Sequence, residues 1–194
     1  MPETVLNAAG NYRDFRCDED GNACAVPPLS GLPLMYFLTS AGNGTGEINL
    51  IGNYAAAVTD FYYLAPAGYR YRVYTVQLCI ADASTMNQID YGAIAGGLTN
   101  GLTIWIRLAS GVELPLLGGM SVKTNQHFLN LTRHAMLTQF PGVPQSFVVS
   151  FPIWKDHGMP ITLEPGDRFI ARLHDDYTPL VSHTFLLRGI RSLV

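Results

Sequence analysis

Histidines and carboxylates are the residues of this chain best able to do chemistry, but few of them are grouped. The five histidines lie in no HxH pair with a glutamate, no HExxH and no 2-His-1-carboxylate spacing, the patterns that bind catalytic metals. The nearest candidate is His174-Asp175-Asp176 together with His183, which two strands could bring to one end of a sheet. A solvated loop between antiparallel strands explains these residues equally well. We therefore predict no metal site. The histidines are His127, His134, His157, His174 and His183.

Other catalytic patterns are missing from the sequence. No serine lies in a GxSxG elbow, and the glycine-rich AIAGGLTNG has neither a lysine nor a strand-to-helix context for a phosphate loop. The stretch DEDGN from Asp18 to Asn22 resembles the start of a calcium loop, but Leu29 stands where such a loop needs a glutamate. We expect no enzyme activity, no catalytic residue and no cofactor, with a cupin-like metal enzyme as a remote alternative.

Aromatic side chains form the other candidate feature, because rings can stack on sugar faces. The favoured interpretation is that they fill a core and a subunit interface. Strand parity places Trp105 and Trp154 outward. The aromatic residues concerned are Tyr62, Tyr63, Tyr69, Tyr71, Tyr74, Trp105 and Trp154.

The elements that must position these residues are β-strands. The stretch from Tyr69 to Ile80 predicts a long central strand with apolar side chains on both faces. Tyr71, Val73 and Cys79 share one face, and Val76 and its even-numbered neighbours share the other. We therefore expect other parts of the protein to pack on both faces of this strand. Ser110-Gly111 predicts a tight hairpin. About eight core strands follow at a spacing typical of a sandwich. The strands are predicted at residues 34–39, 60–64, 69–80, 103–108, 112–117, 147–154, 159–163, 168–174 and 181–190.

The predicted fold class is all-β: a single antiparallel β-sandwich, jelly-roll-like, over residues 34–194. Residues 1–33 are polar and rich in Pro and Gly, and predict an extended N-terminal arm with a small hairpin around DEDGN. Residues 126–139 fit either a helix or an irregular excursion. Cys79 is expected to be a small buried hydrophobe. Cys17 and Cys24 could face each other across the hairpin, although free thiols are favoured in a reducing cytosol.

Bulk composition excludes several functions. Charged residues make up 14% of the 194 residues, against roughly 25% in an average domain, so either the core is large or other subunits cover part of the surface. The net charge is −3 without a basic run, which argues against nucleic acid. No apolar run approaches the ~18 residues of a membrane span, and the start lacks a signal peptide. We expect a soluble protein made in a cytosol.

Three segments resemble small virion structural proteins of tailed bacteriophages. They are YLAPAGYRYRVYTVQLCIAD, DYGAIAGGLTNGLTIWIRLASG and PITLEPGDRFIARLHDDYTPLVSHTFLLRGI. The resemblance covers roughly residues 55 to 190, and the DEDGN hairpin is in keeping with it. It implies a β-sandwich decoration or cement protein on the virion capsid surface, without catalytic residues, commonly a trimer bound to the major capsid protein.

From this resemblance we predict a homotrimer whose residues 1–33 reach over the capsid or an adjacent copy. The alternative is a receptor- or glycan-binding module of a tail tip or fibre. The predicted interface residues are Phe15, Asp18, Asp20, Asn22, Pro27, Pro28, Trp105 and Trp154.

Overall fold

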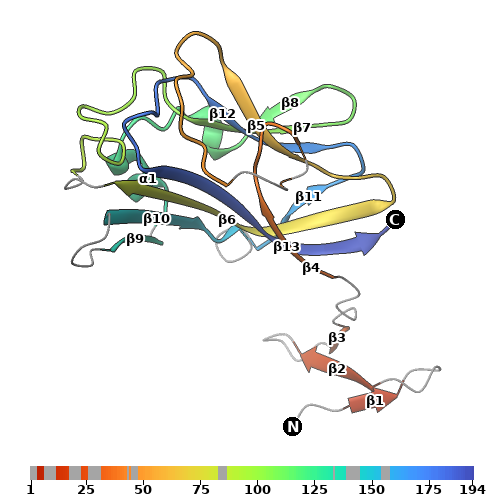
Figure 1. Ribbon diagram of the computed structural model, residues 1–194. Coiled ribbons are helices and arrows are strands. Elements are labelled where there is room, and N and C mark those ends of the chain that lie inside the picture. Colours follow the sequence, from red (N-terminus) through yellow and green to blue (C-terminus); the bar gives the residue numbers. More distant parts are fainter. Residues whose placement is uncertain are drawn as a thin grey trace. The chain divides into compact units, whose positions relative to one another are not determined.

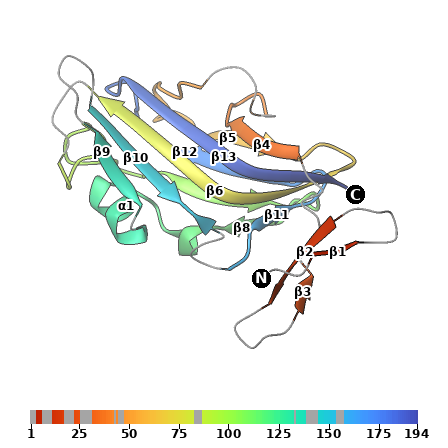
Figure 2. The same cartoon turned by 90° about the horizontal axis from the view of Figure 1, so that it is seen from below.

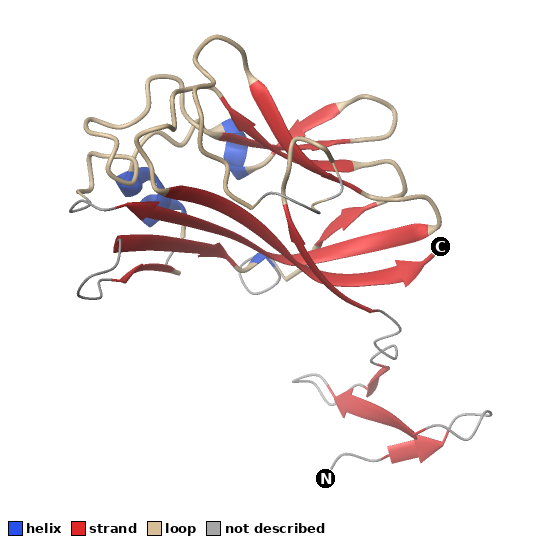
Figure 3. Ribbon diagram, in the orientation of Figure 1, coloured by secondary structure: helices blue, strands red, loops and turns tan. Residues whose placement is uncertain are grey.

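The computed structural model describes residues 4–6, 12–17, 23–25, 32–42, 44, 48–82, 87–132, 134–138, 145–153 and 158–194. The chain divides into two compact units, Met1–Leu32 and Pro33–Val194. Nearly all described regular structure is β-strand, as Figure 3 shows in red.

The first unit contains a three-stranded antiparallel sheet in the order β1-β2-β3. Its strands are β1 (Thr4–Leu6), β2 (Tyr12–Cys17) and β3 (Ala23–Ala25). The predicted hairpin is therefore present as β2 and β3, and β1 adds a third strand. In the β2–β3 register, Cys17 lies opposite Ala23 and Cys24 lies opposite Arg16, so the two cysteines are not register partners.

The second unit is the predicted sandwich of two antiparallel sheets, seen edge-on in Figure 1. Consecutive strands alternate largely between the sheets, and the sheet orders β4-β13-β6-β10 and β5-β12-β7-β8 are those of a jelly roll. The larger sheet contains β4 (Leu32–Phe37), β13 (Ser182–Leu193), β6 (Tyr69–Asp82), β10 (Gln145–Phe151) and β9 (Ala135–Thr138), with β11 (Ile161–Leu163) also paired to β6. The smaller sheet contains β5 (Thr59–Leu64), β12 (Arg168–Leu173), β7 (Thr103–Arg107) and β8 (Glu113–Pro115).

The core lies between the sheets and follows strand alternation. Phe169, Ala171 and Leu173 of β12 are buried, and Ile104 and Ile106 of β7 pack on the same side. Alternation places one residue in two on the inner face, so these side chains fill the space between the sheets.

Segment 126–139 combines two structures. The helix α1 (Asn125–Leu131) begins after Thr124, whose side chain accepts a hydrogen bond from the His127 amide, a typical N-cap. Its Phe128 is fully buried. The chain then enters strand β9, so Ala135 and Met136 belong to the larger sheet and not to the helix.

A β-bulge between β6 and β13 corrects the prediction for the central strand. Thr75 lies opposite Arg188 and Val73 lies opposite Gly189, so Tyr74 is an extra residue in β6. The alternation changes phase there, and the two apolar sets both face the core. The expectation of cover on both faces is therefore wrong. The buried residues from both sets are Tyr71, Val73, Val76, Leu78 and Ile80.

Cys79 shows the consequence of this phase change. Unlike Tyr71 and Val73, with which it shares parity, it lies on the outer side of β6 and is half-buried. Burial raises the pKa of its thiol. The expectation of a buried hydrophobe is thus only partly met.

The bulge predicts a specific intolerance at Gly189. A Cβ there would lie 2.0 Å from the Arg72 carbonyl oxygen, so Gly189→Ala must force the strands apart. We expect a loss of about 3 kcal/mol in the free energy of unfolding, measured by urea denaturation. The control is Gly52→Ala, whose Cβ would meet only the outer end of the Tyr54 side chain, with the hydroxyl at 3.0 Å. Equal stability of both variants would contradict the bulge.

Candidate functional site

The residues considered for a metal site each have a structural role. The Asp175 carboxylate accepts hydrogen bonds from the Gly101 amide at 2.6 Å and from the Asn100 amide at 3.0 Å. Asp176 accepts from the Thr178 amide at 2.9 Å in a local turn. No group of three potential ligands exists among the residues that the structure describes.

His183 is fully buried and belongs to no cluster of potential metal ligands among the described residues. Its Nε2 lies 2.6 Å from the Tyr91 hydroxyl, and its ring packs 5.0 Å from that of Tyr177. Burial lowers the pKa of the imidazole to about 3. The ring is therefore neutral at physiological pH and serves as an aromatic core residue with one polar contact.

Close packing and hydrogen bonds explain the residues of the glycine-rich loop AIAGGLTNG and of the turn Pro165-Gly166-Asp167, here called the PGD turn. A Cβ on Gly97 would lie 2.6 Å from the Lys123 carbonyl oxygen, so this loop passes close to another backbone. Asp167 accepts hydrogen bonds from the Ala109 amide at 2.8 Å and the Glu164 amide at 2.9 Å. The packing and the hydrogen bonds of these motifs fix the conformation of two loops.

Trp105 lies on the outer side of β7, as predicted, but other side chains cover it. Arg172 binds Asp60 through Nε at 2.6 Å and Glu113 through Nη2 at 2.9 Å, and its guanidinium lies 5.5 Å from the Trp105 ring centroid. Hydrogen bonds from Arg172 hold the pKa of Glu113 below its ordinary value. The indole nitrogen is buried without a partner among the described residues. This face is closed by internal ion pairing and offers no open stacking platform.

The tyrosines do not form a platform either. Tyr63 and Tyr71 are buried, with ring centroids 5.3 Å apart, and Tyr36 packs 4.6 Å from Tyr63. Arg191 lies 5.1 Å from the ring of Tyr69 at the same end of the sandwich. The interpretation as core residues is confirmed for Tyr63 and Tyr71, whereas Tyr62, Tyr69 and Tyr74 are only half-buried.

Most of the predicted interface residues lie where the structure gives no description. Phe15 is in β2, opposite Ala25, and Trp105 is placed as above. The remaining predicted residues lie outside the described residues: Asp18, Asp20, Asn22, Pro27, Pro28 and Trp154.

The outer side of the six-stranded sheet carries a candidate interface that the sequence reasoning missed. In the register, Thr184, Cys79 and Val148 form one row across β13, β6 and β10, and Met136 of β9 extends it. Figure 2 looks onto this side, where the strands lie next to one another. We call the following ten uncharged residues the neutral face: Ser182, Thr184, Leu186, Gln77, Cys79, Ala81, Ser146, Val148, Ser150 and Met136.

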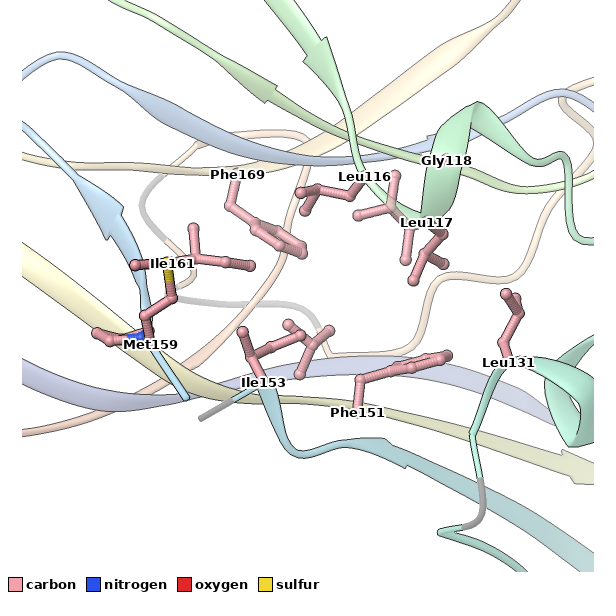
Figure 4. A pocket seen from close by; sticks show the side chains of 12 residues that line it. Leu116, Leu117, Gly118, Leu131, Phe151, Ile153, Met159, Ile161 and Phe169 are labelled. Atoms are coloured by element: carbon pink, nitrogen blue, oxygen red, sulfur yellow. The ribbon is translucent and has the colours of Figure 1, made fainter. Parts of the chain in front are cut away.

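A cavity of about 440 Å³ opens between the two sheets (Figure 4). Phe169 and Leu116 line one side, Phe151 and Ile153 the other. Leu117 in its wall has φ 54°, an unfavourable backbone conformation for leucine. Among the described residues, the wall of this cavity contains no titratable side chain. The other lining residues are Val76, Ile104, Gly118, Leu131, Met159, Pro160 and Ile161.

Comparison of the chain with protein family models, with curated proteins and with solved structures found no match. Among the described residues, no helix is long and apolar enough to cross a membrane. The function is therefore inferred from the surfaces of the sandwich and from the sequence resemblance.

Asp175→Asn tests the structural role of this carboxylate. The amide side chain cannot accept all the bonds that Asn100 and Gly101 donate, so we expect the free energy of unfolding to fall by about 1–3 kcal/mol. Asp176→Asn, on an exposed turn, is the control and should lose less than about 1 kcal/mol. Thermal denaturation with and without EDTA measures both. A melting temperature lowered by EDTA would instead revive the metal interpretation.

His183 predicts a pH dependence of stability. The folded state keeps the ring neutral, whereas the unfolded chain binds a proton below pH 6.5. Stability is therefore complete above pH 6.5 and is lost as the pH falls toward 3, by about 1.4 kcal/mol per pH unit. Urea denaturation between pH 6.5 and 4.5 should show this slope.

Two variants distinguish the contribution of His183 to this pH dependence from the contributions of other titratable groups. His174, whose pKa burial also lowers, contributes to the same slope, so the comparison is made between variants. His183→Gln should reduce the slope of unfolding free energy against pH by about 1.4 kcal/mol per pH unit, which corresponds to one bound proton. His134→Gln, at an exposed position, should leave the slope unchanged. Identical slopes in all three proteins would refute the assignment.

Proposed function

We propose that this protein is a structural virion protein that binds the outside of a tailed-phage capsid and stabilises it. The major capsid protein is its partner, and it acts as a homotrimer. The neutral face is the single observation that carries this proposal.

The neutral face has the properties of an interface centre. Charged residues are depleted at the centres of interfaces, because each charge must lose its water. Its side chains are mostly small, so a partner can approach the sheet closely. By contrast, the outer side of the four-stranded sheet carries Arg172, Asp60 and Glu113, which satisfy one another. The neutral face thus accounts for part of the low charge content of the chain.

The size of the neutral face indicates that other residues complete the interface. Three strands about 4.8 Å apart, with three same-face positions each, cover roughly 300 Å². A stable interface needs about 800 Å² on each partner. In our proposal residues 1–33 supply part of the remainder by reaching over the capsid or an adjacent copy.

The sequence resemblance supports the same function through residues that shape the fold. The glycine-rich loop and the PGD turn are held by Asp175 and Asp167. Both lie in segments that resemble phage virion proteins. The tail-tip alternative would need an exposed aromatic surface, and Trp105 is covered by Arg172.

Val148→Arg tests the proposal at the centre of the neutral face. An unpaired charge there should weaken binding to undecorated capsids by about tenfold or more, measured by co-sedimentation. Val112→Arg is the matched control, since Val112 is 52% exposed in the turn between β7 and β8, and it should bind like the wild type. Circular dichroism checks that both variants fold.

Wild-type binding itself should be saturable and stoichiometric, and light scattering should give a trimer. Deleting residues 1–33 should abolish particle binding and leave a folded sandwich. A monomer that ignores capsids but binds glycans on an array would replace this proposal by the tail-tip function.

A further inference from the structure

Beyond the bulge, the outer side of the six-stranded sheet changes from neutral to basic. Tyr71, Val73 and Leu187 face the core, so alternation turns Arg72 and Arg188 outward. Arg188 lies opposite Thr75, and Arg72 lies opposite Ile190 on the same strand pair. Both arginines are exposed. We call Arg72 and Arg188 the basic end of the neutral face.

Neither arginine of the basic end has a carboxylate partner among the described residues. The nearby Glu164 is bound to Arg70 at 2.7 Å. Every other carboxylate whose side chain is described accepts hydrogen bonds within the chain: Asp60, Asp90, Glu113, Asp167, Asp175 and Asp176. The described part of the sandwich therefore carries two arginines of unmatched charge on one face.

We propose that the neutral face and its basic end dock on an acidic surface of a different protein, the capsid subunit. This inference rests on the proposed function and names the chemistry of the partner. Charge complementarity favours an acidic surface on the partner, because carboxylates that lie opposite Arg72 and Arg188 would form two ion pairs across the interface. The neutral face beside them supplies contact without desolvating further charge.

A second copy related by a two-fold axis does not satisfy this face. In a two-fold contact the same patch meets itself, so Arg72 and Arg188 of both copies would gather in one interface. The described carboxylates of the partner copy are already hydrogen-bonded. Like charges in such a contact oppose association. A two-fold pairing through this face is therefore disfavoured.

The test is a charge reversal, Arg72→Glu with Arg188→Glu, in the full chain. Capsid binding at low salt should weaken by about tenfold or more, and the difference should shrink at 1 M salt, where the screening length falls to about 3 Å. The control is Arg107→Glu with Lys123→Glu, which changes the net charge equally at sites away from this face. It should bind within about twofold of the wild type.

The outcomes separate this inference from the function on which it rests. Wild-type binding with an unaffected Arg72→Glu/Arg188→Glu variant would overturn the acidic-partner inference and leave the capsid function standing. A changed oligomeric state of that variant in light scattering would overturn it as well, because the face would then join copies of this chain. Absence of wild-type binding would overturn the capsid function and the inference with it.

Discussion

The structure depends on the register shift between β6 and β13. A strand of 14 residues would normally divide its apolar side chains between two faces. The bulge at Tyr74 changes the phase of the alternation, so both halves of the strand contribute to one core. Gly189 makes this possible, because any side chain there would collide with the Arg72 carbonyl. The same shift places Arg72 outward, next to the neutral face, so core packing and the surface pattern have one origin.

The two outer surfaces of the sandwich use polar residues in different ways. On the four-stranded sheet, Arg172 forms ion pairs with both Asp60 and Glu113. Its guanidinium lies over the Trp105 ring and covers it. On the six-stranded sheet, serine, threonine and short apolar residues occupy the same kind of position. A surface with no charge to desolvate suits protein contact, and this asymmetry is the physical basis of the capsid-binding proposal.

Several of the described carboxylates act as acceptors for backbone amides. Asp167 and Asp175 each hold two loop amides, which lets loops rich in glycine keep one conformation at the ends of the strands. Such residues resemble catalytic candidates in the sequence because Asp and His cluster there. Their hydrogen bonds show that Asp167 and Asp175 stabilise loops of the jelly roll.

The sequence by itself determined the β class, the approximate positions of most strands, the first hairpin and the outward side of Trp105, because alternation and turn residues act over a few neighbouring residues. It did not predict β1 or β9. It left open whether residues 126–139 are helical, because a short helix and a strand share that segment. Only the tertiary structure decided the phase of β6, which depends on a backbone contact between Gly189 and Arg72, residues far apart in the chain. Likewise, the position of Arg172 over Trp105 and the rows of residues in the neutral face depend on the register between neighbouring strands. The part of each strand that forms the neutral face shows uncharged outward residues in its own sequence, yet which of these stretches are neighbours is a property of the assembled sheet.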